Sequence, residues 1–304
     1  GPRQGMTVRI LQFGTTGQLA RELLAQARDF DVEITALSRE DADFADPEMV
    51  ARRLGGLNMD LVVIACAYTA VDKAESEEEL AHQINAETPA AIAGMLGGHG
   101  PALVYVSTDY VFSGDKGAPY VEDDATGPLN VYGASKLEGE RLVLACCPRS
   151  LVIRTSWVVS AHGKNFIKTM LRLAGEGAPM RVVADQVGRP TAARDLARFI
   201  LSQAERLTAA KAGDPAFGVV HFANTGEVSW RDLAQTAVEL AMGKAAPTIQ
   251  GIPTSEYPTP ARRPMRASMD TGKLQRVFGV KPRPWREAVA EIVAELSTEQ
   301  RSAA

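Results

Sequence analysis

The sequence is short of the residues that build disulfide frameworks and metal centres. Its 304 residues include three cysteines, two of them adjacent at Cys146 and Cys147, and four histidines. This number and spacing fit neither a disulfide scaffold nor a zinc site. Cys66 lies inside an apolar run and is interpreted as a core residue. We therefore expect a reducing, cytoplasmic location and no catalytic metal.

Long apolar runs and a large excess of one charge are also missing. No stretch reaches the length of a transmembrane helix, and we expect no signal peptide before Met6. The net charge of −4 gives no electrostatic reason to expect nucleic acid or a membrane as partner. Residues 1–5 are interpreted as a cloning remnant. A hydrophobic fraction of 45% is enough for a substantial core.

Strand-like apolar runs alternate with helical patterns through the first half of the chain. The predicted strands are Val8–Phe13, Val32–Leu37, Leu61–Ala67, Ala102–Ser107 and Leu151–Thr155. This alternation is typical of the α/β class and predicts a Rossmann-type doubly wound parallel sheet. Sites in such sheets lie beyond the carboxyl ends of the strands.

The pattern breaks up in the second half. Helices are predicted near Asn165–Ala174, Ala193–Thr208, Ser229–Met242 and Trp285–Leu296. We therefore assign residues 6–155 to an NAD(P)-binding domain and residues 156–304 mainly to a smaller C-terminal substrate-binding domain. Segments near residues 180–222 are expected to return to the first domain.

A glycine-rich turn follows the first predicted strand. The stretch G-T-T-G-Q-L-A begins at Gly14 and leads directly into a helical pattern. Strand, glycine turn and helix form the context of a dinucleotide fingerprint, in which Gly14 permits the turn and Gly17 lets the backbone approach a pyrophosphate. Thr16 and the helix-start residues Gln18 and Leu19 complete the predicted phosphate site. Ala20 stands where a third glycine is common.

The residue after the second strand bears on the choice of cofactor. Ser38 and Arg39 stand where a single acidic residue would indicate NAD. A guanidinium there can pair with a 2′-phosphate, so we predict NADPH, with NADH as the alternative. The competing interpretation is that Arg39 is a solvated surface residue.

Tyr132 and Lys136 form the most informative pair. They are four residues apart, so on a helix they share one face, with Cβ atoms roughly 5–6 Å apart. An ammonium group beside a phenol favours the phenolate and is expected to bring the pKa of the tyrosine closer to neutrality. Thr108 or Ser107, at a strand end, could orient a substrate oxygen. The pair predicts a carbonyl-reducing site, although such a pair also occurs on ordinary helix surfaces.

With these motifs in order, the chain resembles the extended short-chain dehydrogenases/reductases, and within them the dTDP-4-dehydrorhamnose reductases. The stretches that carry the resemblance are G-T-T-G-Q-L at Gly14, A-Y-T-A-V-D-K-A-E at Ala67, S-T-D-Y-V-F at Ser107, V-Y-G-A-S-K-L-E-G-E at Val131, R-T-S-W at Arg154, N-F-I-K-T-M at Asn165, D-Q-V-G-R-P-T at Asp185, R-R-P at Arg262 and S-M-D-T-G-K-L at Ser268.

The resemblance implies reduction of the C4 keto group of dTDP-4-dehydro-β-L-rhamnose, the last step of dTDP-rhamnose biosynthesis. The implied catalytic residues are Thr108, Tyr132 and Lys136. Implied cofactor contacts, besides the glycine turn, Arg39 and Lys136, are Asp43, Phe44, Ala65, Ala67 and Tyr68. Implied substrate contacts are Thr69, Val71, Asp109, Tyr110, Trp157 and Arg263, the last through the diphosphate.

Some members of the family dimerise around a magnesium ion held by glutamates. Glu22 fits one such position, but Arg194 occupies another, which makes a magnesium site here doubtful and leaves a homodimer open. Ile64 stands where the family often has asparagine. Two alternatives remain: a reductase or epimerase of another nucleotide-linked 4-keto-6-deoxy sugar, and a non-catalytic NADP-binding regulatory subunit. The sequence does not fix the stereochemistry at C4.

Overall fold

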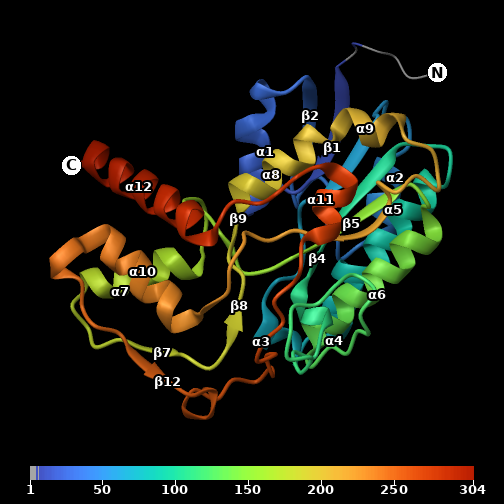
Figure 1. The fold of residues 1–304 in the computed structure, drawn as a ribbon. Helices are drawn as coiled ribbons and strands as arrows, with labels where there is room; N and C mark the ends of the chain where they lie inside the picture. Colours follow the sequence, from blue (N-terminus) through green and yellow to red (C-terminus); the bar gives the residue numbers. More distant parts are fainter. Residues whose placement is uncertain (1–4, 6) are drawn as a thin grey trace.

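The computed structural model describes residue 5 and residues 7–304, so the predicted cloning remnant lies outside the described residues except at Gly5. A six-stranded parallel sheet forms the centre of the molecule, in the order β2-β1-β3-β4-β5-β10 (Figure 1). Its strands are β1 (Val8–Phe13), β2 (Val32–Leu37), β3 (Leu61–Ile64), β4 (Ala102–Thr108), β5 (Ser150–Thr155) and β10 (Gly218–His221). The predicted Rossmann-type α/β fold class is confirmed.

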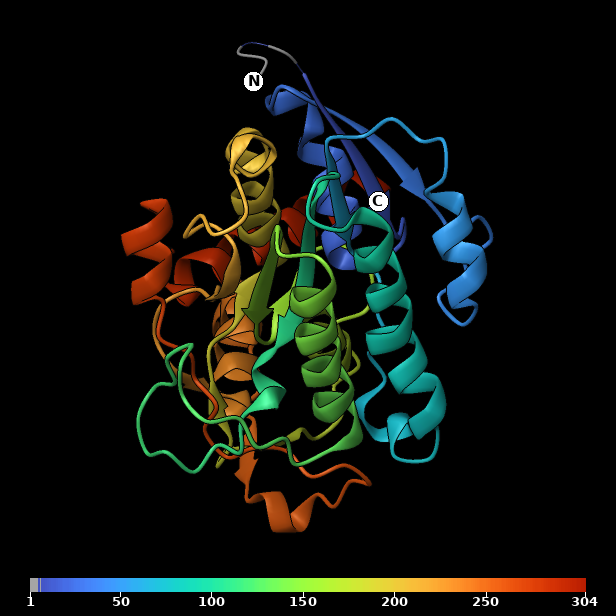
Figure 2. The same ribbon diagram turned by 90° about the vertical axis from the view of Figure 1, so that its right-hand side faces the viewer.

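Helices cover both faces of the sheet (Figure 2). One layer contains α1 (Gln18–Gln26), α8 (Ala193–Ser202) and α9 (Ala204–Ala209), and the other contains α2 (Pro47–Arg53), α5 (Thr88–Leu96) and α6 (Val131–Cys146). Side chains of a strand alternate between faces, so Val8 and Ile10 of β1 join the core under α1 and α8. Leu11 and Phe13 of the same strand join the core on the opposite face.

The predicted strands agree closely with the observed ones, with one informative difference. β1 and β2 have the predicted bounds, whereas β3 ends at Ile64 instead of Ala67. The chain leaves the sheet there because the carbonyl of Ala65 turns towards the glycine loop, within 3.1 Å of where a Cβ on Gly14 would lie. The residues beyond β3 are therefore loop residues at the carboxyl edge of the sheet.

The helical segment between Glu78 and Leu96 is interrupted. It consists of α4 (Glu78–His82), a π-helical turn at Gln83–Glu87, and α5. A short helix, α3 (Val71–Ala74), precedes it. Further single turns of 3₁₀-helix lie at Ala27–Asp29, Asp109–Val111, Gly243–Ala245 and Thr254–Glu256.

Most of the C-terminal segments pack together beside the carboxyl edge of the sheet. Helices α7 (Phe166–Gly175), α10 (Trp230–Met242) and α12 (Trp285–Ala303) share one apolar cluster, and α7 and α10 share a second. These helices lie apart from the main sheet in Figure 1. Three two-stranded ribbons join them: β6 (Val158–Val159) with β9 (Thr191–Ala192), β7 (Arg181–Val183) with β12 (Gln250–Ile252), and β8 (Val187–Gly188) with β11 (Val228–Ser229).

Two parts of the second half lie against the main sheet instead. They are α8 to β10 and the short helix α11 (Gly272–Phe278), which contributes Leu274 to the core under α1. The division near residue 155 stays a prediction. Among residues 5 and 7–304, none of the helices has the length and apolar character needed to cross a membrane.

Candidate active site

The glycine loop lies where the strand order reverses, between β1 and β3. In doubly wound sheets of this order, ligands bind at that switch point. Gly14 has φ +106°, and a Cβ there would lie 3.1 Å from both the Ala65 carbonyl oxygen and the Cys66 Cβ. Any other residue would therefore be strained and crowded at this position.

A buried glutamine that the sequence reasoning overlooked supports the loop. Gln12, fully buried in β1, donates from Nε2 to the carbonyls of Gly14 at 2.9 Å and Ala20 at 3.2 Å. Gly17 then caps α1, with its exposed backbone at the positive end of the helix. Thr16 is also exposed, Gln18 is partly buried and Leu19 is buried. The Oε1 atom of Gln18 is buried without a hydrogen-bond partner in the described chain.

This cradle fits a dinucleotide cofactor because it offers free backbone amides and an unsatisfied polar atom at the switch point. Arg39 lies exposed just after β2, and Asp43 accepts a hydrogen bond from the Ala45 amide at 2.9 Å. Phe44 is buried and packs edge-on against Phe13, with ring centroids 5.4 Å apart. The phenyl ring of Phe44 is therefore at least partly a core contact.

The loop that follows β3 is fixed to α6, the helix of Tyr132 and Lys136, by Asn85, which the sequence reasoning also missed. Asn85 is buried in the π-helical turn, accepts from the Tyr68 amide at 2.9 Å, and donates to the Tyr68 carbonyl at 3.0 Å. Its Nδ2 atom also contacts the Ser135 hydroxyl at 3.0 Å. A π-helical turn is frequent at functional sites, but no simple sequence pattern announces one.

Helix α6 begins at an asparagine cap and carries Tyr132 in its first turn. Asn130 accepts from the Gly133 amide at 2.7 Å, a capping preference readable from the sequence. A Cβ on Gly133 would collide with the Tyr110 carbonyl, so glycine lets the helix approach the turn after β4. The Tyr132 ring meets Tyr110 edge-on, at 6.0 Å between centroids. Its phenol lies close enough to the Thr108 hydroxyl for that group to favour a lower pKa of the tyrosine.

The predicted effect of Lys136 on Tyr132 is wrong in this structure. Desolvation raises the pKa of the Tyr132 phenol to about 12, and the opposing interaction with Thr108 does not cancel it. The ammonium group of Lys136 is buried instead over the Tyr105 ring, 4.5 Å from its centroid. Burial lowers the pKa of Lys136 to about 8, against the opposing influence of Cys66 and Glu140. Lys136 therefore lies towards the loop after β3.

A buried ion pair links α6 to β5 of the sheet. Arg154 of β5 donates to Glu140 of α6, with Nη2 to Oε1 at 2.8 Å, and both side chains are about 95% buried or more. Ser107, which points to the face opposite Thr108, donates to Glu140 Oε2 at 2.5 Å. Removing one member of such a pair would leave a buried charge uncompensated. The network fixes the helix that carries Tyr132 and Lys136 against β4 and β5.

Asp109 and Arg263 bring the two halves of the chain together around Tyr110. Asp109 is buried, and desolvation raises its pKa to about 7, although a hydrogen bond from Thr108 at 3.2 Å opposes the shift. Arg263 pairs with Asp72 of α3 through both terminal nitrogens, at 2.5 and 3.1 Å, and also interacts with the Tyr110 hydroxyl. Asp72 is the aspartate of the A-Y-T-A-V-D-K-A-E stretch at Ala67, and the sequence alone did not indicate its role.

A cavity of about 370 Å³ lies beside this arginine. Its wall includes Ser113, Gln186, Tyr257, Arg262 and Arg263. Of the other predicted substrate contacts, Thr69 is exposed and Val71 is partly buried at the start of α3. The guanidinium groups and the cavity suit an anionic, elongated ligand.

Trp157 stands out by its backbone. It has φ +47°, and no other non-glycine residue in the described chain has a positive φ. This conformation costs on the order of 1–3 kcal/mol for a bulky residue and has to be held by its surroundings. Trp157 lies two residues beyond Thr155, the register partner of Thr108 in the parallel pair of β4 and β5. The end of β5, which lies beside Thr108, therefore leads directly to Trp157.

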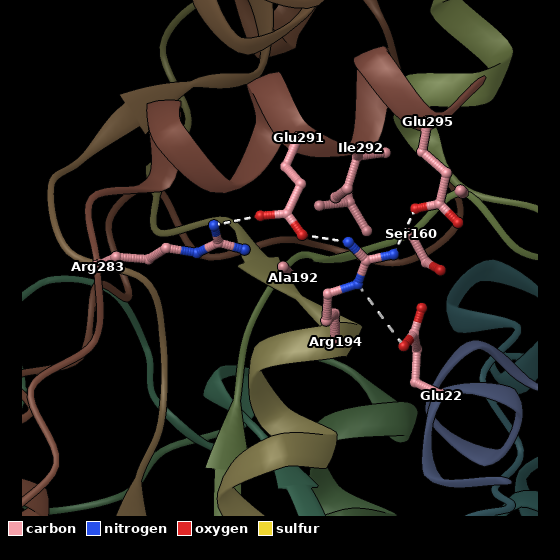
Figure 3. Close-up of a pocket in the computed structure, with 10 residues that line it drawn as sticks. Glu22, Ser160, Ala192, Arg194, Arg283, Glu291, Ile292 and Glu295 are labelled. Atoms are coloured by element: carbon pink, nitrogen blue, oxygen red, sulfur yellow. Dashed lines mark hydrogen bonds and ion pairs between the residues drawn. The ribbon is translucent and has the colours of Figure 1, made fainter. Parts of the chain in front are cut away.

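Two glutamates of α12, which the sequence analysis did not name, lie near Glu22, and the Arg194 guanidinium lies among the three carboxylates (Figure 3). Arg194 pairs with Glu291, with Glu295 at 2.6 Å, and with Glu22 at 3.9 Å. Burial lowers the pKa of Arg194, but the carboxylates together raise it above its usual value. The cavity between them is about 10 Å³, room for no more than about one water. This donor set does not fit a magnesium ion.

The fold and the site define a nucleotide-dependent oxidoreductase of the short-chain dehydrogenase/reductase type. The family profile described as "RmlD substrate binding domain" matches residues 8–298. The dTDP-4-dehydrorhamnose reductase of Burkholderia thailandensis is 43% identical, with 95% of this chain and 99% of that protein aligned. The one from Sinorhizobium fredii is 41% identical, over 97% and 100%.

Solved structures agree. The crystal structure of dTDP-4-dehydrorhamnose reductase from Bacillus anthracis in complex with NADP has a TM-score of 0.87 and 32% identity, covering 95% of this chain and 100% of that one. The chain belongs to the family of dTDP-4-dehydrorhamnose reductases.

Proposed function

We propose that this chain reduces the C4 keto group of dTDP-4-dehydro-β-L-rhamnose to dTDP-β-L-rhamnose with NADPH, the last step of dTDP-rhamnose biosynthesis, in the cytoplasm. The observation that carries the proposal is the Thr108–Tyr132 pair at the end of β4, on the carboxyl edge of the sheet that also carries the glycine loop. Full-length similarity to reductases of this name supports the choice of substrate.

The role of proton donor to the substrate is assigned to Tyr132. Its phenol, with a pKa near 12, keeps its proton at neutral pH and donates it to the C4 oxygen as negative charge develops there. Thr108 orients the same oxygen through its hydroxyl. Bound NADPH supplies the hydride. Lys136, buried towards the loop after β3, is assigned to the nicotinamide ribose.

The cofactor-binding residues are assigned along the carboxyl edge of β1, β2 and β3. Gly14, Thr16, Gly17, Gln18 and Leu19 are assigned to the phosphates. The remaining assignments run from the adenine end inwards: Arg39, Asp43, Phe44, Ala65, Ala67 and Tyr68. Exposed Arg39 supports NADPH over NADH, because its guanidinium is free to meet a 2′-phosphate.

The sugar nucleotide is assigned to the cavity between the Arg262–Arg263 segment and the turn after β4. Arg263 is assigned to the diphosphate, supported by its half-buried position beside Tyr110 and in the cavity wall. Thr69, Val71, Asp109, Tyr110 and Trp157 surround the sugar. We propose no nucleic-acid or membrane partner, and a homodimer, if one forms, that does not depend on magnesium.

The test is turnover with dTDP-4-dehydrorhamnose generated in situ, followed by NADPH absorbance, with the product configuration read by NMR. Tyr132→Phe should lower kcat by about 10²–10⁴-fold while leaving the Kd for NADPH within about twofold. Retained turnover in this variant would show that Tyr132 is not the proton donor. If the wild type shows no turnover with either NADPH or NADH although it binds NADPH, the result would point to another 4-keto sugar or a regulatory subunit.

A further inference from the structure

The left-handed backbone conformation of Trp157 has to be stabilised by the contacts of its side chain and backbone. Its indole is stacked on the indole of Trp230, with ring centroids 3.5 Å apart and planes 7° from parallel. Trp230 is the first residue of α10, whose cap is Ser229, and it is itself contacted edge-on by Phe166 at 4.8 Å. Trp230 therefore lies in a packed aromatic cluster and has little freedom to follow a moving partner.

A glycine makes the space for the Trp157 ring. A Cβ on Gly188 would lie 2.5 Å from Cε2, 2.7 Å from Cζ2 and 2.8 Å from Nε1 of the indole. Gly188 has an ordinary backbone conformation, since it is absent from the positive-φ glycines, so this contact is what requires glycine there. In the β8–β11 ribbon, Gly188 pairs with Val228, two residues before Trp230.

The backbone of Trp157 is fixed as well. Its carbonyl accepts from the Thr191 amide at 3.1 Å, and the neighbouring Ser156 hydroxyl donates to the Arg189 carbonyl at 2.7 Å. These contacts hold the chain immediately beyond Thr155, which lies beside Thr108. The plane of the indole is consequently set by three segments: the end of β5, the β8–β9 loop and the start of α10.

We propose that Trp230 and Gly188 are positioning residues that fix the Trp157 indole as a rigid wall of the sugar site and so determine which face of the C4 carbonyl meets the hydride. This inference rests on the proposed function, which places Trp157 at the sugar. Neither residue touches substrate in this assignment; both act through Trp157. An indole that can tilt would allow the sugar ring to bind in two orientations, which would give two C4 epimers.

The variants are Trp230→Leu, which removes the stacking surface, and Gly188→Ala, which displaces the ring by its methyl group. Trp230→Phe keeps a flat ring and serves as the conservative rescue. Trp285→Phe is the matched control, because Trp285 is the remaining tryptophan and packs against the same apolar cluster, with no ring-to-ring contact with Trp157 among the described residues. Two indoles stacked this closely should couple through their strong far-UV transitions and give an exciton couplet in far-UV circular dichroism.

Wild type and Trp285→Phe should both show the couplet, and Trp230→Leu should lose it. Trp230→Leu and Gly188→Ala should raise the sugar-nucleotide KM on the order of tenfold, equivalent to about 1.4 kcal/mol, with the NADPH KM unchanged. Both should also release a measurable fraction of the C4 epimer, detected by NMR. Trp230→Phe should restore most of the KM and the single product.

Three results would overturn the inference. The first is the absence of a couplet in the wild type, and the second is an unchanged sugar-nucleotide KM and product in Trp230→Leu despite its loss of the couplet. The third is a variant in which both KM values, kcat and thermal stability worsen equally. If the wild type turns over no sugar, the proposed function fails separately. The Kd for dTDP-glucose, measured calorimetrically with the same variants, then decides the positioning role: a weaker Kd supports it and an unchanged Kd refutes it.

Discussion

Replacing Asp109 by asparagine should make the protein more stable at alkaline pH than the wild type. The carboxyl is 4% exposed, and desolvation raises its pKa from 3.8 to about 7. The folded chain therefore binds this proton more tightly than the unfolded chain. The stabilisation is fully present below about pH 3.8 and is lost as the pH rises through 7. Asparagine has no such proton to lose.

The magnitude follows from the size of the pKa shift. Across the whole titration the wild type loses about 4 kcal/mol relative to the variant, and between pH 5 and pH 8 about 2.5 kcal/mol. Urea unfolding of both proteins at the two pH values measures the difference in the free energy of unfolding. Asp123→Asn, at an exposed position, controls for the lost charge. A difference between Asp109→Asn and wild type that stays constant with pH would refute the reasoning.

Two further predictions concern charged groups. Arg263→Ala should raise the KM for the sugar nucleotide about 10- to 100-fold through loss of charge-assisted hydrogen bonds, with little effect on the NADPH KM. Arg266→Ala, which removes a pair with Glu227, should leave the KM for the sugar nucleotide unchanged. Equal effects of Arg263→Ala on both KM values would contradict the assignment to the diphosphate. Magnesium and EDTA should leave the Tm of the wild type unchanged. Arg194→Gln removes the guanidinium shared by Glu22, Glu291 and Glu295, so it should lower the Tm and make the Tm rise with magnesium. A wild-type Tm that falls with EDTA would show that the cluster holds a metal after all.

Periodicity and glycine placement were enough to predict the sheet. The bounds of β1 and β2 follow from the apolar runs because these strands are bordered by polar or turn residues. The end of β3 could not be predicted, because Ala65, Cys66 and Ala67 continue the apolar run. Their departure from the sheet depends on how closely Ala65 approaches Gly14, a contact between residues far apart in sequence.

The site was predictable in its residue types but not in its electrostatics. Spacing places Tyr132 and Lys136 on one helix, yet it does not say where the lysine side chain ends. The ammonium group lies over Tyr105, so burial rather than charge dominates the pKa of Tyr132. Likewise, the supporting contacts of Gln12 and Asn85 are side-chain hydrogen bonds to backbone groups, for which the sequence carries no periodic signal.

The supporting residues also explain how the C-terminal segments can act on a tyrosine in the first half of the chain. Asn130 caps the helix of Tyr132 with its oxygen, while its Nδ2 atom donates to the Arg262 carbonyl at 2.8 Å. The adjacent Arg263 reaches Asp72 and Tyr110, and Tyr110 meets the Tyr132 ring. A ligand that moves the Arg262–Arg263 segment must therefore strain both the cap and the ring contact of Tyr132. Under the proposed function, these contacts would link binding of the diphosphate to the placement of Tyr132 through the Arg262–Arg263 segment.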